Sequence, residues 1–159
     1  MKRRKMLHSS ALAIGGLCSC AYLFGKDNLK SNCCFAPEIE ADSLSIKANI
    51  IQIDLEKAAS VNEPGYASYI IDQERNIDLI LVHDDSGKFH ALQRLCTHAG
   101  RSLSYINQRG LLQCNNYNHS TFKLNGEVLN GPAPTALKSY PVVVKDKFLK
   151  ISISQDHEM

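Results

Sequence analysis

Residues 77–93, IDLILVHDDSGKFHALQ, contain two short apolar runs joined by four polar or small residues. Apolar side chains recur along each run with a period near two, which indicates strands rather than helices. The connecting Asp84-Asp85-Ser86-Gly87 has the composition of a tight turn. This stretch therefore predicts a β-hairpin whose strands are residues 77–83 and 88–93.

The strand pattern continues on both sides of this hairpin. Asn125-Gly126 and Lys145-Asp146-Lys147 are further turns between apolar runs, and residues 48–153 contain neither an internal repeat nor an amphipathic stretch of helical length. A series of short strands of this kind predicts an all-β antiparallel sandwich or small barrel, formed as one domain over residues 47–155. The remaining predicted strands are residues 50–55, 69–71, 103–106, 110–112, 121–124, 127–129, 140–144 and 148–153.

The composition fits one globular domain with a modest extra segment. The chain has 159 residues, of which 44% are hydrophobic and 21% charged, so it is neither disordered nor collagen-like. The formal net charge is +2, and residues 1–25 alone carry +4, which leaves −2 for the rest. A nucleic-acid-binding domain needs a basic patch on its folded surface, so the mildly acidic body argues against that class.

The first 25 residues have the layout of an export signal or membrane anchor. Lys2-Arg3-Arg4-Lys5 precedes residues 6–24, a stretch of 19 residues without charge. As a helix this stretch would be about 28 Å long, just enough for the hydrocarbon core of a membrane. Arg3-Arg4 also resembles the twin-arginine export signal. A cleaved signal peptide and a retained anchor both stay open.

Four of the six cysteines lie in this segment or in the stretch that follows it. Leu17-Cys18-Ser19-Cys20 has the outline of a lipoprotein box, in which Cys20 would be lipidated. The alternative is that Cys18 and Cys20 are small apolar residues inside a membrane helix. Residues 26–46 have the composition of a linker and contain Cys33-Cys34, to which we assign no function.

Two short motifs carry soft metal ligands. Each has a cysteine followed closely by a histidine: Cys96 with His98, and Cys114 with His119, with fifteen residues between the two motifs. One interpretation is a disulfide between the cysteines, as expected in an exported protein. A second is a Cys2His2 zinc site, although the usual zinc pattern places the two cysteines together and the two histidines together. A third takes both histidines as surface residues, as we expect of His83, His90 and His157.

The same segments, CTHAGRSL (96–103) and LLQCNNYNHSTFKLNGEVLNGPAPTALKSYPV (111–142), resemble the Rieske [2Fe–2S] domain over residues 89–143. The resemblance implies a Rieske-type antiparallel β-sandwich with cluster-binding loops. It also implies a proline loop at residues 131–134 that covers the cluster, and a strand and turn at 122–126. The implied ligands are two cysteines on one iron and two histidines on the other: Cys96, Cys114, His98 and His119.

Two features depart from the common family pattern. The second motif is Cys-x4-His instead of Cys-x-x-His, and alignment backwards from Phe122 places Asn118 where the histidine is expected. Because asparagine is a poor iron ligand, we predict His119 as the ligand, in a loop two residues longer. Arg101 and Tyr117 stand near the positions where respiratory-type members carry two further cysteines that form a disulfide between the loops. The joint absence of these two cysteines is typical of ferredoxin-type members.

The implied ligand set favours a one-electron carrier. Two ferric ions, two sulfides and two thiolates sum to zero charge, against −2 for an all-cysteine cluster, so an electron is added more easily. Hydroxyls near the sulfides raise the potential further. High-potential members of the family use both a Ser and a Tyr hydroxyl for this purpose. In this chain Ser120 supplies the first, whereas Phe122, which has no hydroxyl, stands near the position of the tyrosine. We therefore expect a potential in the lower half of the roughly −150 to +300 mV family range.

Three functions follow from this resemblance. The first is the iron–sulfur subunit of a membrane or periplasmic oxidoreductase of the quinol-oxidising type, placed in the bacterial periplasm or at the outer face of the cytoplasmic membrane. Its partners would be a cytochrome or an oxidoreductase large subunit, and quinol. The second is a ferredoxin-type donor to an oxygenase, and the third is a cluster-free module of the same fold. In the first two cases the chain is an electron-transfer subunit and not a complete enzyme.

Overall fold

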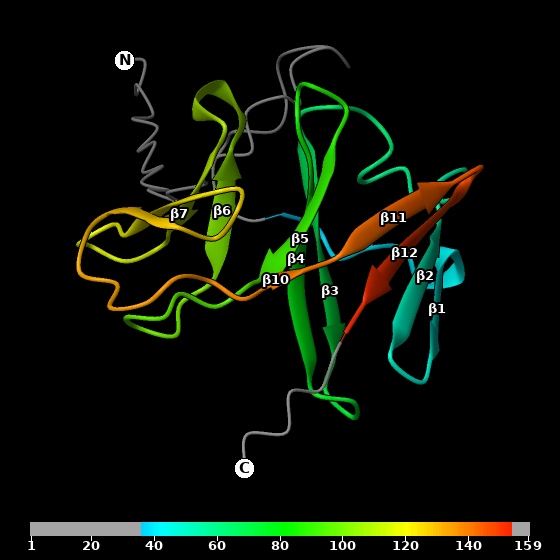
Figure 1. The fold of residues 1–159 in the computed structure, drawn as a ribbon, viewed down its shortest axis with the longest axis horizontal. Helices are drawn as coiled ribbons and strands as arrows, with labels where there is room; N and C mark the ends of the chain where they lie inside the picture. The colour runs from blue at the N-terminus through cyan, green and yellow to red at the C-terminus, as the bar shows by residue number, and fades with distance from the viewer. Residues whose placement is uncertain (1–35, 154–159) are drawn as a thin grey trace, which may run out of the picture.

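The computed structural model describes residues 36–153, which form an all-β fold of three antiparallel sheets (Figure 1). The strands are β1 (Leu44–Lys47), β2 (Ile50–Asp54), β3 (Tyr66–Asp72), β4 (Ile77–His83), β5 (Phe89–Gln93), β6 (Leu103–Ile106), β7 (Leu111–Cys114), β8 (Thr121–Lys123), β9 (Val128–Asn130), β10 (Ser139–Tyr140), β11 (Val142–Lys145) and β12 (Phe148–Ser152). The 3-10 helices η2 (Ala41–Ser43) and η3 (Asn107–Arg109) precede β1 and β7. The strand orders are β1-β2-β12-β11, β10-β5-β4-β3 and β6-β7-β8-β9.

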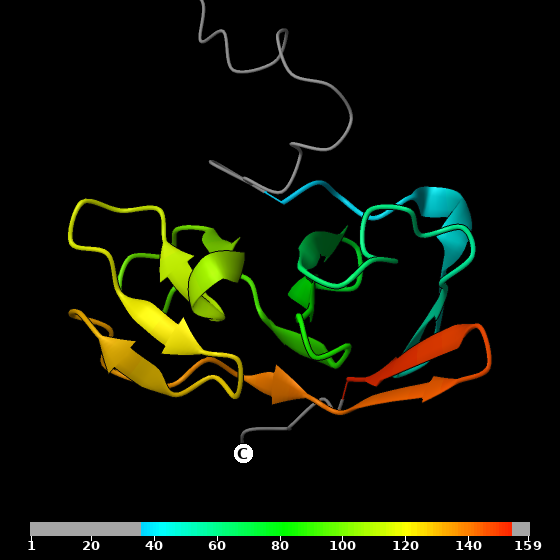
Figure 2. The same cartoon turned by 90° about the horizontal axis from the view of Figure 1, so that it is seen from above.

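The sheet β10-β5-β4-β3 is central, with the other two sheets on either side of it (Figures 1 and 2). Strand β4 supplies both hydrophobic cores, because its side chains alternate between the two faces of the sheet. Leu79 and Leu81 pack into the core shared with β2 and β12, whereas Ile80 and Val82 pack into the core shared with β6, β7 and β8. Burial on both faces explains why residues 79–82 are continuously apolar.

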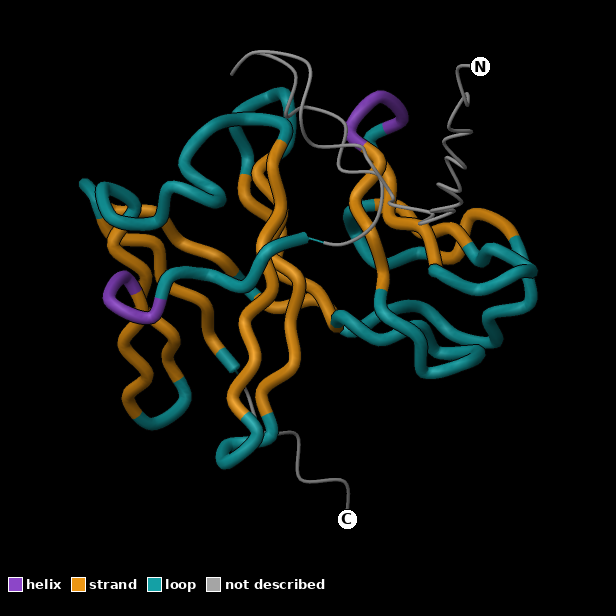
Figure 3. Tube along the Cα trace, turned by 180° about the vertical axis from the view of Figure 1, so that it is seen from behind, coloured by secondary structure: helices purple, strands orange, loops and turns teal. Residues whose placement is uncertain are grey.

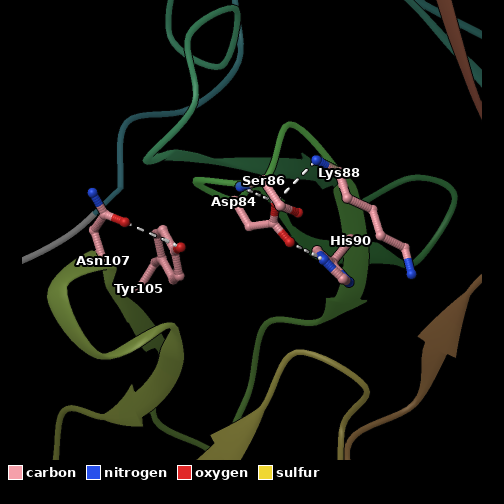
Figure 4. A network of polar contacts seen from close by, with 6 residues as sticks. All are labelled: Asp84, Ser86, Lys88, His90, Tyr105 and Asn107. Carbon is pink, nitrogen blue, oxygen red and sulfur yellow. Dashed lines mark hydrogen bonds and ion pairs between the residues drawn. The ribbon is translucent and has the colours of Figure 1, made fainter.

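The predicted hairpin at residues 77–93 is present as β4 and β5, and Asp84 organises its turn (Figure 4). The Oδ1 atom of Asp84 accepts hydrogen bonds from Ser86 N at 2.9 Å, Ser86 Oγ at 2.6 Å and Lys88 N at 2.9 Å. Its Oδ2 atom lies 2.8 Å from Nε2 of His90. Burial alone would raise the pKa of this carboxyl, but these hydrogen bonds hold the pKa well below its usual range.

Close to this turn (Figure 4), Tyr105 of β6 packs into the core that β6 shares with β4. Its hydroxyl donates a hydrogen bond to Asn107 Oδ1 at 3.3 Å. Burial, followed by the negative charges of Asp85 and Asp84, raises the pKa of Tyr105 to about 12. The tyrosine therefore stays neutral throughout the physiological pH range.

The fold starts earlier along the chain than the sequence predicted. Strand β1 begins at Leu44, inside the stretch 26–46 that we assigned to a linker, and Ile39 is buried in a core. These residues form part of the fold because Ile39 N donates to Tyr69 O at 2.9 Å. The predicted signal or anchor segment, Cys20 and Cys33-Cys34 lie outside the described residues. Within residues 36–153, no helix has the length and apolar character needed to cross a membrane.

Candidate metal centre

Both predicted ligand motifs lie at one end of the β6–β7 hairpin, in loops gathered at the right-hand end of Figure 3. Leu103 of β6 pairs with Cys114 of β7, and an isolated bridge between Leu95 and Ser102 closes the loop that carries Cys96. Strand pairing therefore brings together two cysteines that are far apart in the sequence. We call residues 96–101 the first ligand loop, 114–120 the second ligand loop and 131–136 the proline loop; together they form the tip.

The first ligand loop is a tight turn held by its own backbone. Gly100 N donates to Cys96 O at 2.9 Å, and Cys96 N donates to Arg101 O at 2.8 Å. Thr97 Oγ1 donates to Thr135 O at 2.8 Å, which ties this loop to the proline loop. The position of Cys96 is thus fixed from both sides.

The second ligand loop is closed in a similar way. Cys114 N donates to Ser120 O at 2.8 Å, and His119 N donates to Asn116 O at 3.0 Å. Asn115 N donates to Ser102 O at 3.2 Å, which joins the bases of the two ligand loops. His119 has a φ of +28°, in the left-handed region that non-glycine residues adopt at a cost in energy. The loop holds this histidine in a strained conformation.

The two cysteines form the inner part of the site. Cys96 is 2% exposed and Cys114 is 1% exposed, and both are free thiols rather than a disulfide. The two thiols lie next to each other. Burial, followed by this contact with Cys96, raises the pKa of Cys114 to about 11, so the thiol is protonated at neutral pH until a cation replaces its proton.

The two histidines form the outer part of the site, because His98 and His119 are both exposed. His119 Nδ1 lies 3.1 Å from Cys114 O and 3.3 Å from Gln113 Nε2. Among the described residues, no three His, Cys, Asp or Glu side chains converge closely enough to bind a single metal ion. The structure therefore brings the two thiols together and leaves the two imidazoles at the solvent edge of the same loops.

The other histidines in the described residues lie outside the tip. His90 is paired with Asp84, as described above. The expectation that His83 is a surface residue is wrong, because the residue is 7% exposed and its ring stacks on Phe89 with 4.0 Å between centroids. Its Nδ1 atom lies 3.1 Å from Val61 O. His157 lies outside the described residues.

Ser120 is the buried polar group of the site that has no partner. Ser120 is 1% exposed, and its Oγ makes no hydrogen bond to any residue in the range 36–153. The proline loop covers it closely: Gly131 has a φ of +98°, and a Cβ there would lie 2.6 Å from Ser120 Cα. A buried hydroxyl without an acceptor costs about 1–3 kcal/mol, so this position suits a hydroxyl that donates to a bound group.

These residues fit the [2Fe–2S] cluster that the sequence resemblance implies. Such a cluster needs two protein ligands at each iron, so four donors that do not converge on one point are compatible with it. Two adjacent buried thiols and two exposed imidazoles supply the soft and borderline donors that iron–sulfur clusters of this type use. Ser120 adds a buried hydroxyl beside the second ligand loop.

Sequence reasoning missed one residue that positions the ligand loops. Arg94 Nη1 donates to Ser102 Oγ at 2.7 Å, and Arg94 also forms an ion pair with Asp78 of β4. Its guanidinium lies 5.1 Å from the centroid of the Tyr69 ring, whose hydroxyl donates to Leu103 O at 2.7 Å. Because Asp78 and Tyr69 approach Arg94 only through sheet pairing, no local sequence signal reveals this contact.

Comparison with known proteins gives consistent matches. The family model of the Rieske [2Fe-2S] domain matches residues 55–141, a range that includes the whole tip. The chain is 36% identical over 81 residues to the 3-phenylpropionate/cinnamic acid dioxygenase ferredoxin subunit of Photorhabdus laumondii subsp. laumondii. This alignment covers 50% of this chain and 76% of that protein. It is 28% identical over 104 residues to the cytochrome b6-f complex iron-sulfur subunit of Chlorobaculum thiosulfatiphilum. This alignment covers 65% of this chain and 55% of that protein.

A solved structure agrees with the fold. The ferredoxin of carbazole 1,9a-dioxygenase from Nocardioides aromaticivorans IC177 superposes with a TM-score of 0.51 at 18% sequence identity. The superposition covers 60% of this chain and 94% of that chain. At this level of identity the match concerns the fold alone.

Proposed function

The chain belongs to the Rieske [2Fe-2S] domain family, and from this premise we propose that it is the iron–sulfur subunit of a membrane or periplasmic oxidoreductase of the quinol-oxidising type. Members of the family bind a [2Fe–2S] cluster, which makes the chain a carrier of one electron at a time. The observation that carries the proposal is the pair of buried, adjacent thiols with two exposed imidazoles on the same two loops.

In this proposal Cys96 and Cys114 bind one iron, and His98 and His119 bind the other. The bound cluster supplies a site that accepts and returns one electron without making or breaking a bond in a substrate. The buried cysteine side chains exclude water from the inner side of the site, and burial also favours a cluster whose irons, sulfides and thiolates would sum to zero charge over one that would carry a net charge. The exposed imidazoles bring the other side to solvent, where a partner protein can approach and where a ring nitrogen can exchange a proton.

The proposed location is the periplasm or the outer face of the bacterial cytoplasmic membrane. The support is the layout of residues 1–25, with Arg3-Arg4 ahead of an uncharged stretch. A cluster inserted in the cytoplasm has to cross the membrane inside an already folded protein, which is the task of the twin-arginine route. Replacing Arg3 and Arg4 together by Lys should leave the cluster-loaded protein in the cytoplasm. Unchanged export of this double variant would refute the route.

The type of partner separates this proposal from its alternative. A similarity to a cytochrome b6-f iron-sulfur subunit and the N-terminal segment support a cytochrome and a quinol. Similarity to a dioxygenase ferredoxin subunit, and the presence of Arg101 and Tyr117 where further cysteines could stand, support an electron donor to an oxygenase. Cell membranes supplied with a short-chain quinol should reduce the protein in the first case. The second requires a soluble NADH-dependent reductase.

The test of the site is the EPR and visible spectrum of the anaerobically purified full chain. Single alanine variants of the four proposed ligands, Cys96, His98, Cys114 and His119, should lose the signal of the reduced cluster. Asn118→Ala should keep it, and His90→Gln serves as a histidine control away from the tip. If Asn118→Ala removes the signal and His119→Ala spares it, the assignment of the second loop is wrong. If the wild-type protein has no signal, the cluster-free alternative holds.

A further inference from the structure

Tyr117 is the most exposed large apolar side chain in the described part of the chain. It is 92% exposed, against 60% for Val143, the next in order. It stands in the second ligand loop between the proposed ligands Cys114 and His119, and its backbone N–H donates to Asn116 Oδ1 at 2.8 Å. With so little of its ring buried, Tyr117 contributes almost nothing to the hydrophobic core, so the stability of the fold does not explain an aromatic residue here.

Arg101 lies on the other ligand loop and is also exposed. It is the one Arg, Lys, Asp or Glu among the residues of the tip, and the two histidines there are proposed cluster ligands. Its backbone O accepts a hydrogen bond from Cys96 N at 2.8 Å, and the next residue, Ser102, accepts one from Asn115 N at 3.2 Å, so Arg101 lies where the two ligand loops meet. Its exposed side chain is therefore available to a molecule that approaches the site.

We propose that Tyr117 and Arg101 form the docking contact for the redox partner, a protein that offers an apolar recess to the ring and a carboxylate to the guanidinium. The inference rests on the proposed electron-transfer function of the tip and adds the chemistry of its partner. Tyrosine and arginine are the residue types that most often dominate binding energy at protein interfaces. Here they lie on the two loops through which electrons would enter and leave.

The charge of the tip favours an acidic protein partner over the other surfaces that could bind an exposed tyrosine. A strongly basic partner would be repelled by Arg101 and would find no acidic residue in the tip. An anionic lipid surface is recognised by clusters of Lys and Arg, and the tip has Arg101 alone of these two residue types. One positive charge and one exposed aromatic ring on two joined loops suit a partner surface with a single carboxylate and an apolar patch, and predict weak dependence of binding on salt.

The experiment compares electron transfer from the reduced, cluster-loaded full chain to two forms of one acceptor. Native cytochrome c presents a basic surface, and the same protein after succinylation of its lysines presents an acidic one. Stopped-flow mixing gives the second-order rate constant for wild type, Tyr117→Ala, Tyr117→Phe and Arg101→Gln. The matched controls are Val143→Ala, an exposed apolar residue on β11, and Arg109→Gln, which removes an equal charge at the other end of the β6–β7 hairpin.

With the succinylated acceptor, Arg101→Gln should lower the rate constant about two- to fivefold at low ionic strength, and the loss should vanish at high salt. Tyr117→Ala should lower it about five- to tenfold at every ionic strength, and Tyr117→Phe should restore most of the rate. Both controls should match wild type, and native cytochrome c should react no faster than the succinylated form. Wild-type rates for Tyr117→Ala, or equal losses for Arg109→Gln and Arg101→Gln, would overturn the proposal.

Two further measurements separate a docking defect from loss of the proposed function. The EPR spectrum and midpoint potential of Tyr117→Ala should equal those of wild type, as should its rate with ferricyanide, which is too small to need a docking surface. An absent cluster in the wild type would instead refute the electron-transfer function itself. Analytical ultracentrifugation tests whether a second copy of the chain, and not a separate redox partner, binds at Tyr117 and Arg101. A wild-type dimer that Tyr117→Ala converts to a monomer would overturn docking of a separate partner.

Discussion

The Asp84 turn and the tip are both polar clusters at the ends of antiparallel hairpins, but they differ in how completely their polar groups are paired. Each carboxylate oxygen of Asp84 accepts at least one hydrogen bond from residues of its own hairpin. In the tip, the hydroxyl of Ser120 is buried without a partner, and two thiols contact each other. The first cluster is complete as it stands and stabilises the fold, whereas the second has the unpaired groups of a binding site.

The largest contrast between the two clusters should come from removing their central residues. Cys96→Ala or Cys114→Ala should abolish the EPR signal of the reduced cluster entirely, because one iron would lose a thiolate ligand. Asp84→Ala should leave that signal intact while lowering the thermal midpoint of the apoprotein. A cysteine variant that keeps the native signal would show that the buried thiols are not the ligands.

The second contrast uses one glycine from each region. Gly87 in the Asp84 turn and Gly131 in the proline loop both have a positive φ, +81° and +98°, so alanine is strained at both. A Cβ at Gly87 meets nothing within 4 Å, whereas one at Gly131 would lie 2.6 Å from Ser120 Cα.

Gly87→Ala should therefore cost only the backbone strain, about 1–2 kcal/mol in the free energy of unfolding. Gly131→Ala should cost more and should also shorten the lifetime of the cluster in air, because the proline loop can no longer close over Ser120. Urea unfolding and the decay of visible absorbance measure the two effects. Equal behaviour of the two variants would show that the proline loop does not cover the site.

The third contrast concerns Ser120 alone. If its hydroxyl donates to the bound cluster, Ser120→Ala should lower the midpoint potential, since hydrogen bonds to the sulfides stabilise the reduced state. A hydrogen bond to a charged group contributes about 1.5–3 kcal/mol, which corresponds to roughly 60–130 mV for one electron. The apoprotein should not lose stability, because the hydroxyl has no partner there to lose. Protein-film voltammetry measures the potential, and an unchanged value would remove Ser120 from the site.

The smallest effect is a pH dependence of stability that arises from Asp84. Because its pKa in the folded protein is below the usual value, its contribution is fully present above the ordinary carboxyl pKa and is lost as pH falls toward the folded one. Asp84→Asn should lower the free energy of unfolding by about 1–2 kcal/mol at pH 7, and the difference from wild type should shrink between about pH 4 and pH 2.

Urea unfolding of the apoprotein over this pH range measures the difference. Asp85→Asn is the matched control, because Asp85 is the exposed neighbouring carboxylate in the same turn. A difference from wild type that is constant down to pH 2 would show that Asp84 is not stabilised as a carboxylate.

The comparison of these regions also shows where sequence reasoning succeeds. The hairpin at residues 77–93 was predictable because its turn and its apolar runs are local signals, and the antiparallel all-β fold is confirmed. The division into three sheets was not predictable, because it depends on which strand pairs with which. The continuous apolar run in β4 reflects burial on both faces, which a period of two alone does not reveal.

The start of the fold was placed too late for a related reason. Residues 38–46 have a polar composition typical of a linker, yet Ile39 and Ser43 are buried, and Ser60 Oγ donates to Glu40 at 2.8 Å. These contacts connect residues that are about twenty positions apart or more. Local composition does not reveal contacts of that kind, so the residues of β1 were assigned to a linker.

For the site, the sequence by itself determined the chemistry: two Cys-and-His motifs and a Gly-Pro segment in an order that resembles one family. Residue types and their spacing suffice for that, because ligand preference is a property of the side chains themselves. Only the tertiary structure decided that both cysteines are buried and adjacent, that Ser120 has no partner among the described residues, and that Tyr117 is exposed in the loop between Cys114 and His119. Those properties depend on the register of β6 with β7 and on the closure of the proline loop, and both arise from contacts between residues distant in the chain.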